Sequence, residues 1–164
     1  MKKFLLVCLF FVVSLSLNAQ VKLLTLNELD KRIAKGNDTT YVINFWATWC
    51  TPCVEELPYF EKLNTEYKNK PVKVILLSFD SKSKLQSRVI PFVKDQKLEA
   101  EVYLINEKDQ QTYIEKIDKK WSGSLPATLF INNKNKNRLF YSKPFDTYKE
   151  ITDKLQGLSF NGAK

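Results

Sequence analysis

Two hydrophobic patterns alternate along this chain. Short, continuous apolar runs rich in β-branched and aromatic residues are typical of strands buried on both faces, whereas apolar residues spaced by three and four are typical of helices. Strands are predicted at 41–46, 72–79, 101–105, 129–131 and 139–141, and helices at 25–35, 50–67, 85–93, 113–121 and 146–155. Helices alternate with the first three strands, and a hairpin and a final helix follow. This order predicts an α/β fold with a central mixed β-sheet flanked by helices on both faces.

Two cysteines lie where the most apolar strand, 41–46, leads into a helix. Cys50 is expected at the tip of that helix and Cys53 about one turn inside it. The first N–H groups of a helix lack intrahelical partners and the helix dipole is positive there, so a thiolate is stabilised at this position. Pro52 is tolerated because its missing N–H is one that the first turn leaves unpaired. The pattern therefore favours a redox-active Cys-x-x-Cys pair.

Two structural interpretations of this pair compete with the redox one. A purely structural disulfide across so short a loop stabilises the fold by only about 2 kcal/mol in the chain-entropy model. A zinc site needs further ligands, but the chain has no histidine and its third cysteine, Cys8, lies in an N-terminal leader. Val54 follows Cys53, where a haem attachment motif requires histidine. We therefore expect no metal and no cofactor other than the Cys50–Cys53 disulfide itself.

The first residues have the form of a secretory signal peptide. Lys2 and Lys3 precede an apolar run at 4–17, and cleavage after Ala19 is plausible. An uncleaved membrane anchor is the alternative, although the run is shorter than the roughly 20 residues that span a bilayer. Cys8 lies inside the apolar run rather than after a small-residue cleavage box, which argues against a lipoprotein. We predict a signal peptide at 1–19 and one domain at 20–164, exported to a compartment in which disulfides form.

The composition is basic, with a formal net charge of +8 over 164 residues. The lysines are scattered rather than arranged in a stripe, so a solvated basic surface is favoured and nucleic acid is not expected as a partner. Attraction to an anionic membrane surface or to an acidic partner protein stays open.

A second informative segment surrounds Pro126, which stands at the start of an apolar strand. A proline there can be an ordinary first strand residue. Together with the cysteine segment, however, it resembles the thioredoxin superfamily, and within it the exported TlpA/ResA-like thiol-disulfide oxidoreductases. The resemblance rests on 44–53 (Asn-Phe-Trp-Ala-Thr-Trp-Cys-Thr-Pro-Cys), 56–58 (Glu-Leu-Pro) and 125–131 (Leu-Pro-Ala-Thr-Leu-Phe-Ile). It covers nearly all of 20–164 and implies a thioredoxin-like fold.

The resemblance also implies how substrates bind. Pro126 is expected to follow a cis peptide bond beside the disulfide, which leaves the backbone of Leu125 free to pair with an extended substrate segment. The remaining substrate-binding residues implied by the resemblance flank Cys50; they are Trp49, Thr51 and Pro52.

Glu56 is the third candidate catalytic residue. Asn44 stands where cytoplasmic thioredoxins have a buried acid, and in the TlpA/ResA pattern a glutamate three residues after the second cysteine occupies this region. That spacing places Glu56 on the same helix face as Cys53, where it could accept the Cys53 proton if burial raises its pKa. The alternative is a solvated carboxylate like its neighbour Glu55.

These observations lead to the hypothesis of an exported, periplasmic protein-disulfide reductase. Cys50 attacks a substrate disulfide, and Cys53 resolves the mixed disulfide. Its partners are expected to be proteins with disulfides or thiols and a membrane-linked thiol electron donor, and the chain is expected to be a monomer. The alternatives are a disulfide oxidase or isomerase and a non-catalytic binding module that uses Leu125 and Pro126. A thiol peroxidase is disfavoured, because Ala47 replaces the threonine that peroxiredoxins have three residues before the reactive cysteine.

Overall fold

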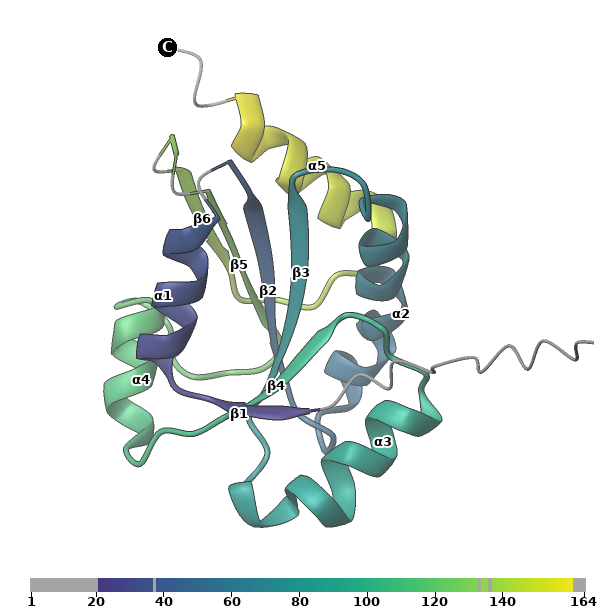
Figure 1. The fold of residues 1–164 in the computed structure, drawn as a ribbon, viewed down its shortest axis with the longest axis vertical. Helices are drawn as coiled ribbons and strands as arrows, with labels where there is room; N and C mark the ends of the chain where they lie inside the picture. Colours follow the sequence, from purple (N-terminus) through teal and green to yellow (C-terminus); the bar gives the residue numbers. More distant parts are fainter. Residues whose placement is uncertain (1–20, 37, 133, 136, 161–164) are drawn as a thin grey trace, which may run out of the picture.

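A computed structural model of the chain describes residues 21–160 except 37, 133 and 136 (Figure 1). The predicted signal peptide at 1–19 lies outside the described residues. Six strands form one sheet in the order β1-β4-β3-β2-β5-β6. The strands are β1 Lys22–Leu24, β2 Thr40–Trp46, β3 Val72–Ser78, β4 Glu101–Ile105, β5 Ala127–Asn132 and β6 Asn137–Tyr141. The helices are α1 Leu26–Lys35, α2 Thr51–Glu66, α3 Ile90–Asp95, α4 Gln110–Ile117 and α5 Tyr148–Phe160.

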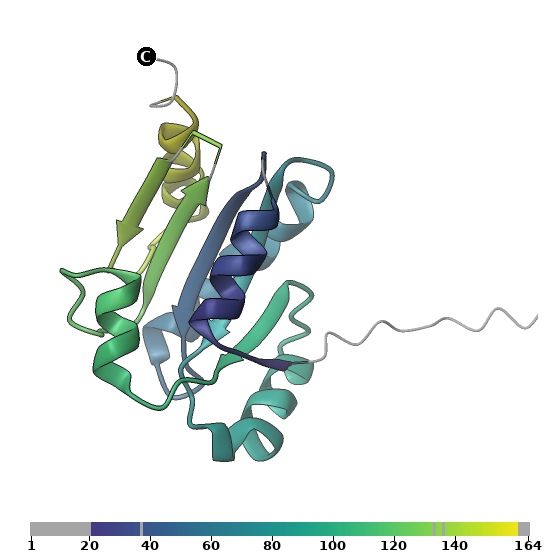
Figure 2. The same ribbon diagram turned by 60° about the vertical axis from the view of Figure 1, so that its left-hand side comes forward.

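The sheet is mixed, as the sequence predicts. β1, β4, β3 and β2 pair in parallel, whereas β5 is antiparallel to both β2 and β6. Figure 2 shows the β5–β6 hairpin extending the sheet beyond β2. In the β2–β5 register, Phe45 lies opposite Ala127. The end of β2 and the start of β5 therefore meet at one edge of the sheet.

Helices cover both faces of the sheet (Figure 1): α1 and α4 lie on one face, and α2, α3 and α5 on the other. Each residue of β2 is buried. Val42 and Trp46 pack into the core beneath α2, α3 and α5, whereas Ile43 and Phe45 pack into the core beneath α1 and α4. This two-sided burial explains why β2 reads as a continuous apolar run rather than an alternating one.

Two predicted helices have different ends in the structure. The helix predicted at 113–121 stops at Ile117, because Asp118 accepts the N–H of Lys120 in a turn that ends it. Trp121 therefore lies outside the helix, where its indole N–H donates to the Ser124 carbonyl at 2.8 Å. The last helix, predicted to end at 155, continues to residue 160 and buries Leu158 in the core.

The segment predicted as a helix at 85–93, with a kink or break at Pro91, belongs to three consecutive helical stretches. Lys82–Lys84 form a 3₁₀ turn, Leu85–Val89 form a π-helical turn, and α3 begins at Ile90 with Pro91 in its first turn. Val89 and Ile90 keep helical backbone angles, so the chain does not break at Pro91. The irregularity is instead the π-helical turn that directly precedes the proline.

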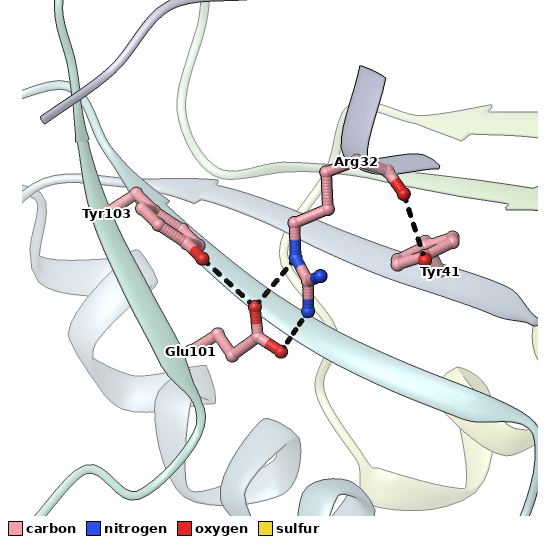
Figure 3. A network of polar contacts seen from close by, with 4 residues as sticks. All are labelled: Arg32, Tyr41, Glu101 and Tyr103. Carbon is pink, nitrogen blue, oxygen red and sulfur yellow. Dashed lines mark hydrogen bonds and ion pairs between the residues drawn. The ribbon is translucent and has the colours of Figure 1, made fainter. Parts of the chain in front are cut away.

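A polar network ties α1 to the sheet (Figure 3). The Arg32 guanidinium binds both carboxylate oxygens of Glu101 on β4, and the Tyr103 hydroxyl donates to the same carboxylate at 3.1 Å. The Tyr41 hydroxyl donates to the Arg32 carbonyl at 3.2 Å. Because Arg32 and Glu101 are about one-third exposed, solvent screens the pair and its contribution to stability is about 1 kcal/mol or less.

Candidate active site

The two cysteines form a disulfide within the first turn of α2. Cys50 is the N-cap residue, and Cys53 lies inside the helix at a Cα–Cα distance of 5.3 Å. Cys50 is 6% exposed, whereas Cys53 is fully buried at 0%. A substrate sulfur can therefore approach the pair only at Cys50. The predicted placement of both residues at the start of the helix is confirmed.

The surface around Cys50 carries an exposed aromatic side chain. Trp49 is 60% exposed and is the one large hydrophobic side chain that is freely exposed among the side chains that the structure describes. Thr51 and Pro52 are also exposed. These three residues flank the cysteine that reaches the surface, and their part in substrate binding stays a prediction.

A buried carboxylate, which the sequence analysis missed, holds the loop that leads to Cys50. Asp80 accepts hydrogen bonds from the backbone N–H of Thr48 at 2.9 Å, the Thr48 hydroxyl at 2.6 Å and the Ser78 hydroxyl at 2.8 Å. The parallel register pairs Trp46 with Ser78, so the loops that follow β2 and β3 are neighbours. An acidic residue directly after a buried strand, at the edge where parallel strands end, was the available signal.

Replacing Asp80 with alanine is expected to lower the free energy of unfolding by about 2–3 kcal/mol, because both Thr48 donors lose their acceptor. Ser78→Ala is the matched control: it removes the Ser78 donor to Asp80 and the acceptor of the Asp80 N–H but leaves both Thr48 bonds in place, so a smaller loss of about 1–2 kcal/mol is expected. Urea unfolding of the oxidised variants measures both values. Equal stability of Asp80→Ala and the wild type would contradict this role.

The segment before β5 has the backbone geometry that the resemblance implied. The Leu125–Pro126 peptide bond is cis, which confirms that expectation. Pro126 is buried and Leu125 is half-buried. Because Phe45 lies opposite Ala127, Pro126 lies level with the end of β2, at the sheet edge from which the chain continues to Cys50.

Glu56 is buried beneath the same region. It is 1% exposed, whereas its neighbour Glu55 is exposed, so the interpretation of Glu56 as a solvated carboxylate is wrong. Its Oε1 accepts a hydrogen bond from Asn44 Nδ2 at 2.7 Å, and its Oε2 accepts one from the Phe145 N–H at 2.8 Å. Burial raises the pKa of Glu56 to about 7, and the two hydrogen bonds oppose this shift. Glu56 can therefore gain or lose a proton near neutral pH.

No cluster of three or more His, Cys, Asp or Glu side chains suited to hold a metal ion occurs within the described residues. In that same part of the chain, each helix is too short or too polar to cross a membrane.

The architecture of the chain is thioredoxin-like, and this defines the class of protein. A thioredoxin-related protein from Neisseria meningitidis serogroup B superimposes with a TM-score of 0.63, covering 74% of this chain and 86% of that chain. The two sequences are 20% identical, so the likeness concerns the fold.

The chain belongs to the AhpC/TSA family, whose family model matches residues 14–138. Thiol-disulfide oxidoreductase ResA of Oceanobacillus iheyensis is 51% identical over 39 residues, which are 24% of this chain and 20% of that protein. Thioredoxin-like protein YneN of Bacillus subtilis is 44% identical over 59 residues, 36% of this chain and 33% of that protein. The matches thus span a fifth to a third of these relatives. They confirm the resemblance to ResA-like proteins.

Proposed function

We propose that this protein is an exported thiol-disulfide oxidoreductase that works as a protein-disulfide reductase. The observation that carries the proposal is the Cys50–Cys53 disulfide at the start of α2, of which Cys50 alone reaches the surface. Membership of the AhpC/TSA family and the likeness to a ResA protein support it.

The reaction begins with the reduced pair. The Cys50 thiolate, stabilised by the N-terminus of α2, attacks one sulfur of a substrate disulfide. The substrate S–S bond breaks, a Cys50–substrate disulfide forms, and the other substrate sulfur leaves as a thiolate that takes up a proton. Cys53 then loses its proton to Glu56 and attacks the Cys50 sulfur. The second substrate thiol leaves, and the Cys50–Cys53 disulfide is restored, so two electrons have passed to the substrate.

Substrate binding uses the exposed surface beside Cys50. Trp49, Thr51 and Pro52 offer contacts around the reacting sulfur, and the backbone of Leu125 before cis-Pro126 offers pairing to an extended segment. The backbone part of this recognition does not depend on the side chains of the substrate, which suits an enzyme that acts on many protein disulfides.

The leader supports the proposed location. A signal peptide at 1–19 delivers the domain at 20–164 to the periplasm, where a membrane-linked thiol donor re-reduces the Cys50–Cys53 disulfide. The mature chain acts as a monomer in this scheme, because Cys50, Cys53, Glu56 and the Leu125–Pro126 segment all belong to one chain.

The test is disulfide exchange with a disulfide-bonded peptide, in chains that also carry Cys8→Ser so that only the two active-site thiols are present. The reduced chain is expected to convert the peptide to its thiol form one for one, whereas Cys50→Ser stays at the uncatalysed rate. A binding module would hold the peptide equally well with and without Cys50 and would leave its disulfide intact. That result would overturn the proposal.

A further inference from the structure

We propose that Asn44 is a positioning residue whose side-chain amide turns over as Glu56 gains or loses its proton, so that each form of the carboxyl group has a hydrogen-bond partner. The inference rests on the proposed function, in which Glu56 takes up the Cys53 proton. It adds a hydrogen-bond partner for each protonation state of Glu56, so that the carboxyl group can both take up and release the proton.

Only the nitrogen of the Asn44 side-chain amide has hydrogen-bond partners. Asn44 is 0% exposed, and its Nδ2 donates both to Glu56 Oε1 at 2.7 Å and to Thr128 Oγ1 at 3.2 Å. Its Oδ1 is buried without any hydrogen-bond partner. Buried polar atoms are nearly always paired, so an unpaired acceptor beside a group that can be protonated calls for a reason.

The two oxygens of Glu56 are not equivalent. Oε2 faces the backbone N–H of Phe145 at 2.8 Å, which can only donate. A proton added to the carboxyl group must therefore lie on Oε1, the oxygen that faces Asn44. An Nδ2 group has two hydrogens and accepts no hydrogen bond, so the amide orientation that suits ionised Glu56 leaves protonated Glu56 without an acceptor.

A half-turn of the amide group resolves this conflict. It exchanges the positions of Nδ2 and Oδ1, so that Oδ1 accepts the proton of Glu56 Oε1. The Thr128 hydroxyl can donate as well as accept, so it pairs with the amide in both orientations. In either orientation one polar atom of the Asn44 amide, Oδ1 or Nδ2, has no partner. The protonation state of Glu56 therefore decides which orientation is more stable. A fixed donor at this position would favour only the ionised form.

Other ionisable groups lie around Glu56, but they do not replace the Asn44 amide as the hydrogen-bond partner of its carboxyl group. Cys50 and Cys53 lie on its own helix in the disulfide, and Tyr141 on β6 is close enough to feel its charge. Burial raises the pKa of Tyr141, and the Glu150, Asp146 and Glu56 carboxylates raise it further, so Tyr141 stays neutral while Glu56 titrates. Within the described ranges, no lysine or arginine forms an ion pair with Glu56.

Nuclear magnetic resonance of the oxidised full chain tests the proposal between pH 5 and pH 9. The Asn44 side-chain amide signals, identified by their loss in Asn44→Leu, are expected to shift with the same midpoint as the Glu56 carboxyl carbon. Cross-relaxation between the amide hydrogens and Thr128 is expected at high pH and lost at low pH. Amide signals that stay constant while Glu56 titrates would overturn the proposal.

Two variants complete the test. In Glu56→Gln nothing titrates at this position, so the Asn44 signals are expected to be independent of pH. In Thr128→Val the carboxyl partner remains, so the signals should still follow Glu56, and signals that stop following it would count against the proposal. None of these measurements needs disulfide exchange. A chain that fails to exchange disulfides but shows the turning amide would disprove the proposed function alone, whereas a fixed amide in an active chain would disprove this inference alone.

Discussion

Replacing Cys53 with serine is expected to stop the exchange after its first step and to leave Cys50 covalently joined to the substrate. A serine hydroxyl does not displace a thiolate from a disulfide, because it is not ionised near neutral pH and forms no S–S bond. With excess peptide disulfide, nearly every Cys53→Ser chain that also carries Cys8→Ser should bear one peptide half. Intact-mass measurement before and after a reductant detects this adduct.

The control for this experiment is Cys50→Ser, again with Cys8→Ser so that the leader contributes no thiol. Its remaining thiol, Cys53, is 0% exposed, so little or no adduct is expected. Equal adduct formation by the two variants would contradict the assignment of Cys50 as the attacking residue. It would mean that the first turn of α2 opens in solution and exposes Cys53.

Glu56 is expected to make the stability of the oxidised chain depend on pH. The pKa of Glu56 is raised from 4.5 to about 7 by burial in the folded chain. The folded chain therefore keeps a proton that the unfolded chain loses, and this contribution to stability is lost as the pH rises from about 4.5 through about 7. The free energy of unfolding should fall by about 3 kcal/mol across this range.

The variant Glu56→Gln removes this dependence. A glutamine amide can accept the Phe145 N–H and donate to the turned amide of Asn44, so it imitates the protonated acid at every pH. Relative to the wild type, the variant should gain about 3 kcal/mol of stability between pH 4 and pH 8. Urea unfolding at several pH values measures the difference, and exposed Glu55→Gln is the matched control, for which no such gain is expected. Parallel pH profiles for the wild type and Glu56→Gln would refute the raised pKa.

Much of the fold could be predicted because its signals are local. The run at 41–46 is apolar without alternation, which a strand covered on both faces requires, and β2 is buried throughout. The helix predicted at 25–35 is confirmed as α1, and a capping box of Thr25 and Glu28, with both of its hydrogen bonds, stands at its start. Trp121 misled the prediction, because its spacing from Ile117 fits a helix while a turn at Asp118 ends that helix first.

The site could be predicted only in part. The helix-start position of Cys50 and Cys53 follows from the change of hydrophobic period, but the cis bond before Pro126 came from family resemblance, since most X-Pro bonds are trans. The contact of Glu56 with the Phe145 N–H has no sequence signature, because any residue at 145 except proline supplies the same donor. Asp80 was missed because Thr48, which donates two of its hydrogen bonds, lies on a loop that only the β2–β3 register brings near.

The reduction potential of the Cys50–Cys53 pair tests the central claim most directly. The chain would be equilibrated with defined dithiol buffers, and its redox state would be followed by tryptophan fluorescence, to which exposed Trp49 beside the disulfide contributes. A protein-disulfide reductase supplied by a thiol donor should have a potential of roughly −250 mV or lower. A potential near about −120 mV would contradict this account and would make the protein an oxidant of exported thiols.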